Sequence, residues 1–352
     1  MAQRTMRGIV KEQAGPGLAF RTDLPYPTIR EDEALFKVNA AAVCGTDLHI
    51  DSWDEWSRKR VKAPVIIGHE VCGTVVEVGS KVTNIKPGDR VAVETHVACY
   101  DCDLCRLGMP HICPRQDIYG VTIPGGFAEY SSVRADVCVK LPDGVTDEMG
   151  AMLEPMGAGV HGVGLAKVKG KTVLVNGCGP IGLMAVGACL VHGAEKVIAS
   201  DIFDEKLDVA GRMGAHVTLN ARREDVPKAV KEMTRGLGCD AAIDYTGSGR
   251  GIVGALRSVR PGGMLVLVGL PAGEVPVNLT EDLIYREITV TGVAGRLMYE
   301  TWEDCIRILQ DPRFDIAPVI GGRYPLERYR EAFDAFKEGA PGKMLLIPDM
   351  KG

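Results

Sequence analysis

The sequence predicts an α/β protein with two domains, one rich in β-strands and one built on a doubly wound parallel sheet. Its 352 residues are the usual length of a two-domain chain. Hydrophobic residues make up 46% of the chain and aromatic residues only 5%, which is typical of large cores of Val, Ile, Leu and Ala. The texture of the sequence also changes near residue 155, where short strand-like runs give way to alternating strands and helices.

The residues before this change have the pattern of a β-rich domain. Short runs of Val, Ile and Thr, separated by Gly, Pro and Asp, predict strands at 33–38, 73–78 and 90–93. The end of the chain returns to this pattern, with a helix expected at 326–338 and a strand at 343–347. We therefore expect residues 1–155 and 297–352 to form one domain, into which residues 156–296 are inserted as a second.

The composition argues against several classes of partner. The formal net charge is -5, so the chain offers no basic field to nucleic acid. Charges near the N-terminus interrupt any signal-peptide core, and the longest apolar run, at 181–191, is too short to span a bilayer. We therefore expect a cytoplasmic protein that acts on a small molecule, without a membrane partner. Its eleven cysteines are then reduced thiols or metal ligands.

A thiol, an imidazole and a carboxyl group stand at Cys44, His69 and Glu70. Zinc takes this mixture of ligands in catalytic sites, where a coordination position stays open for water or substrate. Thr46 and His49 follow Cys44 closely, and a hydroxyl and an imidazole there could carry a proton away. The alternative is a buried cysteine, a core histidine and a surface glutamate that never meet.

Four further cysteines have the spacing of a structural zinc site, Cys99-x2-Cys102-x2-Cys105-x7-Cys113. Four thiolates this close in sequence can surround one tetrahedral ion without regular structure between them. Two disulfides or a coincidence are the alternatives, but the absence of a secretory signal favours the metal. Such an ion would order a loop that buries too little apolar surface to order itself.

A glycine fingerprint stands between an expected strand at 171–176 and an expected helix, as Gly177-Cys178-Gly179-Pro180-Ile181-Gly182. The next strand ends at Asp201, which lies 24 positions after Gly177. Gly177 would allow a tight turn, Gly179 a close approach to a pyrophosphate, and Gly182 close packing of helix on strand. In this context the motif predicts a dinucleotide-binding Rossmann unit, and a glycine-rich packing turn is the alternative.

Strands and helices continue to alternate after the fingerprint, as in a doubly wound parallel sheet. Strands are expected at 196–200, 240–245, 264–268 and 288–291, with a helix at 249–259. Ligands of such sheets bind at the carboxyl ends of the strands. Cofactor contacts are therefore expected from the residues that follow two of these strands, which are Val268, Gly269, Leu270, Val293 and Ala294.

Two groups of zinc ligands ahead of a Rossmann unit resemble the layout of the zinc-dependent medium-chain alcohol dehydrogenases, over nearly the whole chain. The resemblance implies a GroES-like fold for the β-rich domain, which would be the catalytic one. Two further stretches resemble the L-threonine 3-dehydrogenases of that family, namely Trp53-Asp54-Glu55-Trp56 and Gly295-Arg296-x-Met298-x-Glu300-Thr301-Trp302. An NAD-linked homotetramer with one catalytic and one structural zinc per chain is then expected.

The resemblance also implies roles for single residues. Cys44, His69 and Glu70 would hold the catalytic zinc, and Thr46 and His49 would relay the proton. Glu154, where many relatives have Asp, would lie near the metal and ligate it in some states, and His96 would face the substrate. The structural zinc would be held by Cys99, Cys102, Cys105 and Cys113.

The cofactor-binding positions implied in the same way are Gly177, Gly179, Pro180, Ile181, Gly182, Asp201 and Lys206. Lys206 replaces the commoner Arg, so it would offer a point charge rather than a fork to the ribose phosphate. Ala294 replaces an aromatic residue that often packs on the nicotinamide.

The implied reaction is oxidation of the 3-hydroxyl of L-threonine to 2-amino-3-oxobutanoate. Polyol and 2,3-butanediol dehydrogenases share both zinc sites and the fingerprint, and they are the nearest alternative. A non-catalytic binding protein on the same fold is a third interpretation, because a fold does not determine a function. The complete set of metal ligands and relay groups argues against it.

Overall fold

The computed structural model describes residues 4–351 and divides the chain into two compact units. The first unit ends at Glu154 and resumes at Ile320, and the second runs from Pro155 to Val319. This division differs from the predicted one at Pro155 and at residues 297–319, which lie in the second unit. The segment contains helix α9 (Glu300–Leu309), whose Trp302 and Cys305 are buried.

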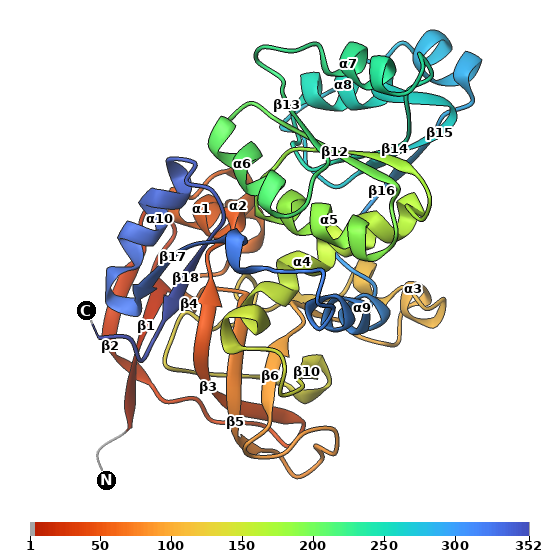
Figure 1. Cartoon of the computed structure of the whole chain (residues 1–352). Helices are drawn as coiled ribbons and strands as arrows, with labels where there is room; N and C mark the ends of the chain where they lie inside the picture. Colours follow the sequence, from red (N-terminus) through yellow and green to blue (C-terminus); the bar gives the residue numbers. More distant parts are fainter. Residues whose placement is uncertain (1–3, 352) are drawn as a thin grey trace. The chain divides into compact units, whose positions relative to one another are not determined.

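The first unit is rich in β-strands, as its sequence predicts (Figure 1). Its named strands pair antiparallel, except for β17 and β18, which pair parallel. Its main sheet has the order β10 (Cys138–Lys140), β6 (Arg90–Val93), β5 (Glu70–Val78), β3 (Glu33–Ala42), β18 (Lys343–Ile347) and β17 (Ile320–Pro325), with β9 (Tyr130–Arg134) also paired to β3. A second sheet contains β2 (Ala19–Pro25), β1 (Thr5–Lys11) and β4 (Val65–Ile66), and a short ribbon pairs β7 (His96–Val97) with β8 (Asp117–Ile118). The C-terminal strands therefore pack back on the first domain, as expected.

Short helices connect and cover these strands. They are α1 (Gly45–Ser52), α2 (Glu55–Arg60), α3 (Asp103–Arg106) and α10 (Tyr329–Lys337). The helix expected at 326–338 begins with a 3-10 turn at Leu326–Arg328 before α10. Helix α4 (Asp147–Ala166) carries the chain from one unit into the other.

The second unit contains a six-stranded parallel sheet, which confirms the predicted fold class. The strand order is β13 (Val217–Asn220), β12 (Lys196–Asp201), β11 (Thr172–Asn176), β14 (Cys239–Asp244), β15 (Val259–Leu267) and β16 (Thr289–Gly292). The connecting helices are α5 (Pro180–Val191), α6 (Asp204–Arg212), α7 (Val226–Met233) and α8 (Gly249–Ser258). The order reverses between β11 and β14, which is where doubly wound sheets bind ligands.

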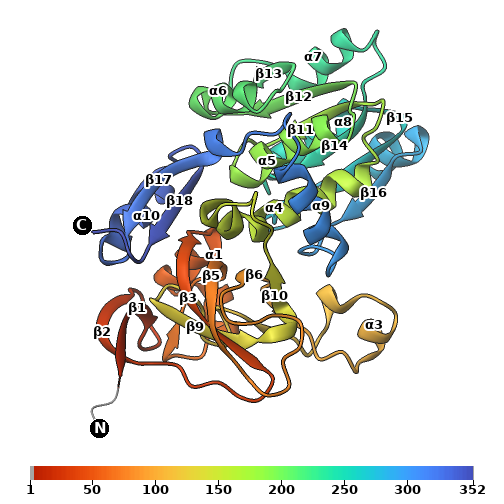
Figure 2. The same cartoon turned by 60° about the horizontal axis from the view of Figure 1, so that its bottom comes forward.

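The apolar strands of this sheet are covered by helices on both faces. In Figure 2 the strands β11, β12 and β14 lie close to helices α5 and α8. Val173, Leu174 and Val175 of β11 are fully buried, as the continuous apolar run of a central parallel strand predicts.

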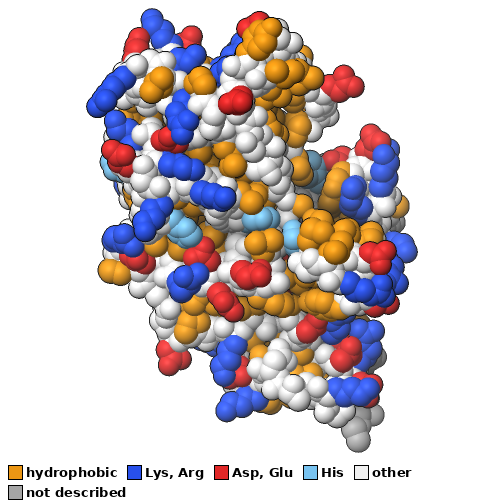
Figure 3. Space-filling model, turned by 90° about the vertical axis from the view of Figure 1, so that its right-hand side faces the viewer, with side chains coloured by type: hydrophobic (Ala, Val, Ile, Leu, Met, Phe, Trp, Pro, Cys, Tyr) orange, Lys and Arg blue, Asp and Glu red, His pale blue; other side chains and the backbone are white. Residues whose placement is uncertain are grey.

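Within the described residues, no helix is both long and apolar enough to cross a bilayer. Basic and acidic side chains are interspersed on the face drawn in Figure 3.

Candidate functional site

The structure brings Cys44, His69 and Glu70 together in the first unit, with ligand atoms within 4.8 Å of one another. Cys44 follows the end of β3 and precedes α1, while Glu70 begins β5. The antiparallel register of β3 and β5 pairs Ala42 with Glu70, and it closes the gap between the two segments. The alternative in which the three residues never meet is therefore wrong.

Asp47 connects two of these residues. One of its carboxylate oxygens, Oδ2, accepts the backbone N–H of Cys44 at 2.8 Å. The other, Oδ1, lies 3.8 Å from Nδ1 of His69, and both of these buried atoms lack a hydrogen-bond partner in the described part of the chain. A metal-bound imidazole ordinarily turns its second nitrogen to a carboxylate, so Asp47 stands where such a partner belongs.

The chemistry of these groups fits a zinc ion. Burial raises the pKa of the Cys44 thiol, so the thiolate form needs a neighbouring cation. A thiolate, an imidazole and a carboxylate are ligands that zinc accepts, and three protein ligands leave a fourth position for substrate. The residues present therefore match a catalytic rather than a structural zinc.

Thr46 and His49 both lie on α1. Thr46 Oγ1 is 3.7 Å from Sγ of Cys44, so the hydroxyl lies beside the group of ligands. His49 lies one turn further along the helix and has a side chain that is 57% exposed. Its Nδ1 is 2.6 Å from Oδ2 of Asp54. A partly buried hydroxyl followed by an exposed imidazole is a suitable order of groups for moving a proton toward water.

Glu154 and His96 are also held in the first unit. Glu154 is buried within α4, and its negative charge helps to raise the pKa values of Cys44 and Glu70, although burial is the main cause. His96 lies on β7, where its Nδ1 is 2.7 Å from Oε1 of the fully buried Glu94. Their predicted roles, beside the metal and toward the substrate, remain predictions.

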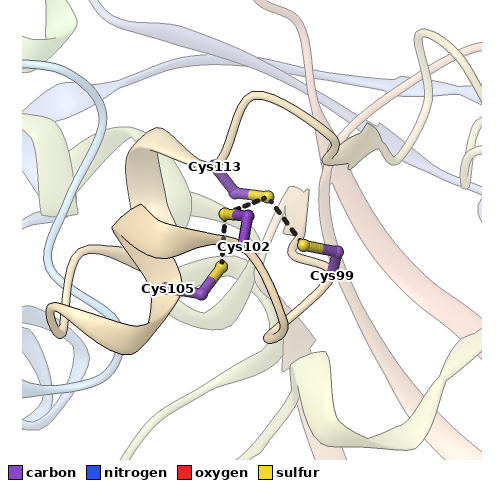
Figure 4. A group of neighbouring side chains, drawn as sticks. All are labelled: Cys99, Cys102, Cys105 and Cys113. Carbon is purple, nitrogen blue, oxygen red and sulfur yellow. Dashed lines mark hydrogen bonds between the residues drawn. The ribbon is translucent and has the colours of Figure 1, made fainter.

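The four clustered cysteines surround a point in the loop that contains α3 (Figure 4). Sγ of Cys102 lies 3.4 Å from that of Cys105 and 3.7 Å from that of Cys113, which is 3.4 Å from that of Cys99. A tetrahedral zinc with Zn–S bonds of about 2.3 Å separates its sulfurs by about 3.8 Å. All four are free thiols, so the alternative of two disulfides is wrong, and the cluster fits a zinc ion.

The glycine fingerprint forms a strand-to-helix turn in the second unit. Gly177 has a φ of 98°, and a Cβ on Gly182 would lie 1.9 Å from the carbonyl oxygen of Gly177. A Cβ on Gly179 would meet no protein atom within 4 Å. Helix α5 begins at Pro180 without a side-chain cap, so its first N–H groups are available to a phosphate.

A cavity of about 910 Å³ adjoins this turn and contains several of the predicted cofactor positions. Gly177, Gly179, Asp201 and Lys206 line it. Oδ2 of Asp201 accepts the N–H of Cys178, while Oδ1 accepts the N–H groups of Ile202 and Phe203 at the end of β12. The fixed carboxylate and the open turn fit a dinucleotide with a free ribose hydroxyl.

The other predicted cofactor positions do not line this cavity. They are Pro180, Ile181, Gly182, Val268, Gly269, Leu270, Val293 and Ala294. Val268 to Leu270 follow β15, and Val293 and Ala294 follow β16, so these five lie at carboxyl ends of strands as expected. Their contacts with the cofactor remain a prediction. Arg222, which the sequence did not single out, lines the cavity and lies over the ring of Phe203.

Comparison with known proteins agrees with both units. Residues 30–143 match the profile of the alcohol dehydrogenase GroES-like domain, and residues 180–311 match that of the zinc-binding dehydrogenases. The chain is 40% identical over 343 residues to L-threonine 3-dehydrogenase of Bacillus licheniformis, covering 97% of this chain and 99% of that one. This chain belongs to the zinc-binding alcohol dehydrogenase family.

Solved structures of other zinc-binding dehydrogenases have the same fold. A putative zinc-binding dehydrogenase from Sinorhizobium meliloti bound to NADP superposes with a TM-score of 0.90, at 30% identity, covering 98% of this chain and 100% of that one. The 2R,3R-butanediol dehydrogenase from Bacillus subtilis superposes with a TM-score of 0.89, at 27% identity and the same coverage. The fold is therefore shared by dehydrogenases whose names differ in substrate.

One residue of this zinc-binding dehydrogenase site was missed by sequence reasoning. Nζ of Lys343, at the start of β18, lies 2.5 Å from both carboxylate oxygens of Glu70 and 3.1 Å from the carbonyl oxygen of Val43. Both side chains are almost fully buried. Burial is the largest influence on the pKa of Lys343 and lowers it, but the charges of Glu70, Cys44 and Glu154 and the hydrogen bond to Glu70 together raise that pKa. The only indication of this contact in the sequence is that a lysine is the first residue of an otherwise apolar strand.

Proposed function

We propose that the protein is an NAD-linked, zinc-dependent L-threonine 3-dehydrogenase that forms 2-amino-3-oxobutanoate. The observation that carries this proposal is the 40% identity, over 99% of its length, to a relative of that name. The Cys44, His69 and Glu70 group agrees with it, because that group can hold the metal such an oxidation needs. The Trp53-Asp54-Glu55-Trp56 stretch points to the same group of relatives.

The residues of the first unit have separate tasks in this reaction. Cys44, His69 and Glu70 would hold a zinc ion, which supplies a Lewis acid that lowers the pKa of a bound hydroxyl. Asp47 fixes Cys44 through its backbone and faces the imidazole of His69. These contacts hold the donors in place before a substrate arrives, which reduces the cost of reorganisation.

Proton removal falls to α1. The hydroxyl of Thr46 can accept one proton while donating another, so it can pass a proton on without storing charge. His49 is exposed at the far end of the same helix and can release that proton to water. Both belong to the first unit, so their spacing along α1 is fixed by one helix.

The second unit would hold NAD, which accepts the hydride from the carbinol carbon. The Gly177 turn and the first N–H groups of α5 would bind the pyrophosphate. The carboxylate of Asp201 would accept a hydrogen bond from a ribose hydroxyl. The chain thus supplies orientation and charge, while the cofactor supplies the redox chemistry.

We expect NAD to be preferred over NADP by roughly 10²-fold in kcat/KM, because like charges ~4 Å apart repel by about 4 kcal/mol before screening by salt. Asp201→Ser should remove most of this preference, because it removes the negative charge that repels the 2′-phosphate of NADP. The cationic side chains of Lys206 and Arg222, which also line the cavity, would then attract that phosphate. Asp204→Ser is a matched control, because Asp204 pairs with Arg223 outside the cavity lining. Equal kcat/KM for both cofactors in the unchanged protein would exclude this role of Asp201.

The substrate is tested by kcat/KM for L-threonine, 2,3-butanediol and sorbitol at saturating NAD. Threonine carries an ammonium and a carboxylate group, which need polar partners once water is displaced. Glu154, His96 and the segment 53–56 are candidates in the first unit, and Arg296 is one in the second. We expect threonine to exceed both alcohols by about 10²-fold or more, because unpaired site groups penalise uncharged analogues. A higher value for butanediol or sorbitol would favour the alternative dehydrogenases.

We further propose two zinc ions per chain, a homotetramer and a cytoplasmic location. The second zinc is supported by the sulfur positions of Cys99, Cys102, Cys105 and Cys113. The eleven free cysteines agree with a reducing compartment. The tetramer rests on the resemblance to the family alone.

A further inference from the structure

The exposed imidazole of His49 is paired with a carboxylate that has a second, fixed contact. Oδ2 of Asp54 lies 2.6 Å from Nδ1 of His49. Oδ1 of Asp54 accepts the backbone N–H of Ser57 at 3.0 Å and its hydroxyl at 3.1 Å. Asp54 is the N-cap of α2, so the start of that helix fixes the orientation of the carboxylate.

A turn between the two helices brings this pair together. Residues five apart on one helix point about 140° away from each other, so a continuous helix would separate them. Instead α1 ends at Trp53, which has φ 57° and ψ 47° and donates its N–H to the carbonyl oxygen of His49. Nε of Arg58 donates to the carbonyl oxygen of Trp53 at 3.0 Å and holds the turn from the α2 side.

The contact decides which nitrogen of His49 carries a proton. An ionised carboxylate only accepts hydrogen bonds, so Nδ1 must be the donor and Nε2 keeps its lone pair. The backbone N–H of Ser57, and to a lesser degree His49, hold the pKa of Asp54 below its usual value. The side chains of His49 and Asp54 are 57% and 35% exposed, and exposed pairs add little stability, so the tautomer is the main consequence.

We propose that Asp54 is a positioning residue that keeps His49 in the Nδ1–H tautomer, with Nε2 ready to accept the proton released by the substrate hydroxyl. This role rests on the proposed function, in which His49 is the last group of the relay. The proton binds to Nε2 and forms an imidazolium ion beside the ionised Asp54. It then leaves from Nε2 to water, and Asp54 stays ionised throughout.

The substitution Asp54→Asn tests the effect of Asp54 on the His49 tautomer separately from its effect as the N-cap of α2. The amide oxygen can still accept from Ser57, and Asn is as good an N-cap as Asp. The amide NH2 then faces Nδ1, which must become an acceptor, so the proton moves to Nε2 and the relay is blocked. We expect kcat for L-threonine to fall about 10- to 100-fold, the usual effect of losing such a supporting partner, with little change in KM.

Ser57→Ala is the matched control, because it removes one contact to Oδ1 and leaves Oδ2 on His49. Ser57 is fully buried, so loss of its hydroxyl should lower stability. The kcat of this variant should nevertheless stay within about twofold of the unchanged enzyme, because the contact of Oδ2 with His49 remains. A loss equal to that of Asp54→Asn would assign the effect to the helix cap and overturn the proposal.

The tautomer itself is read by 15N–1H spectra of histidine-labelled, zinc-loaded protein without substrate, with His49 assigned from His49→Gln. We expect an Nδ1–H signal in the unchanged protein and an Nε2–H signal in Asp54→Asn. The same tautomer in both proteins would overturn the proposal. This readout needs no turnover, so it remains decisive if L-threonine is not the substrate.

A double-mutant cycle with His49→Gln completes the test on the enzyme's best substrate. If Asp54 acts through His49, Asp54→Asn should cause no further loss of kcat in the His49→Gln background. An equal loss in both backgrounds would place the action of Asp54 elsewhere and contradict the proposal. Failure of the unchanged enzyme to oxidise threonine would count against the proposed function alone.

Discussion

Replacing Lys343 by Met is expected to lower the free energy of unfolding by about 3–5 kcal/mol, because it leaves a buried charge without its partner. Lys343 contacts both oxygens of Glu70, and both side chains are almost fully buried. Burial alone would raise the pKa of Glu70, and the lysine opposes that rise. Equilibrium unfolding in urea measures this loss of stability. The dependence of the free energy of unfolding on urea concentration should be the same in the variant and the unchanged protein, which excludes a change in the unfolded state.

The double variant Lys343→Met with Glu70→Gln is the control for this prediction. It removes both charges, so most of the stability should return. Lys37→Met is a second control, because Lys37 pairs with Asp349 at the surface and such pairs contribute about 1 kcal/mol or less. A loss below about 1 kcal/mol for Lys343→Met would show that the lysine does not compensate Glu70.

Mild chelation should remove one zinc per chain and lower kcat about 10³-fold or more, since the metal contributes several kcal/mol to the transition state. The three-residue group around Cys44 would hold a metal with three protein ligands, whereas four thiols would hold the metal of the other group. The Cys99 to Cys113 loop should therefore keep its zinc longer.

Metal analysis, activity and far-ultraviolet circular dichroism are measured on the same chelated samples. Activity should return when zinc is added, and the spectrum should not change during removal. Cys44→Ser provides a variant that should contain one zinc from the start. A fully active chain with a single zinc ion would contradict the assignment of two sites.

The parts of the site that were predictable from sequence are those whose members are close along the chain. Cys99 to Cys113 lie within fifteen residues, and the glycine turn is one continuous stretch, so spacing alone indicates the chemistry. The meeting of Cys44 with Glu70 instead depends on the register of β3 and β5, which no local pattern records. For this group the residue types suggested a metal site, but the pairing of β3 with β5 is what brings the residues together.

Other features depended on long-range packing and were missed. Lys343 is separated from Glu70 by 273 positions, and only the pairing of β18 with β3 brings it to the metal ligands. The segment 297–319 carries an amphipathic helix whose apolar face could cover either unit, and its buried Trp302 does not reveal which one from sequence. Asp54 was noted only within a motif, since its contact with His49 depends on the left-handed turn at Trp53.

The pairing of Lys343 with Glu70 also has a consequence for biosynthesis. Glu70 leaves the ribosome long before Lys343, and the whole second unit is synthesised between them. During that interval Ala41 and Ala42 of β3 lack their later partner β18, although β9 can already pair with residues 33–37 of the same strand. The carboxyl group of Glu70 likewise lacks Lys343. The metal ligands are therefore made early, but the charge that opposes the burial-driven rise in the pKa of Glu70 arrives among the last residues translated. Completion of this site is tied to the end of protein synthesis.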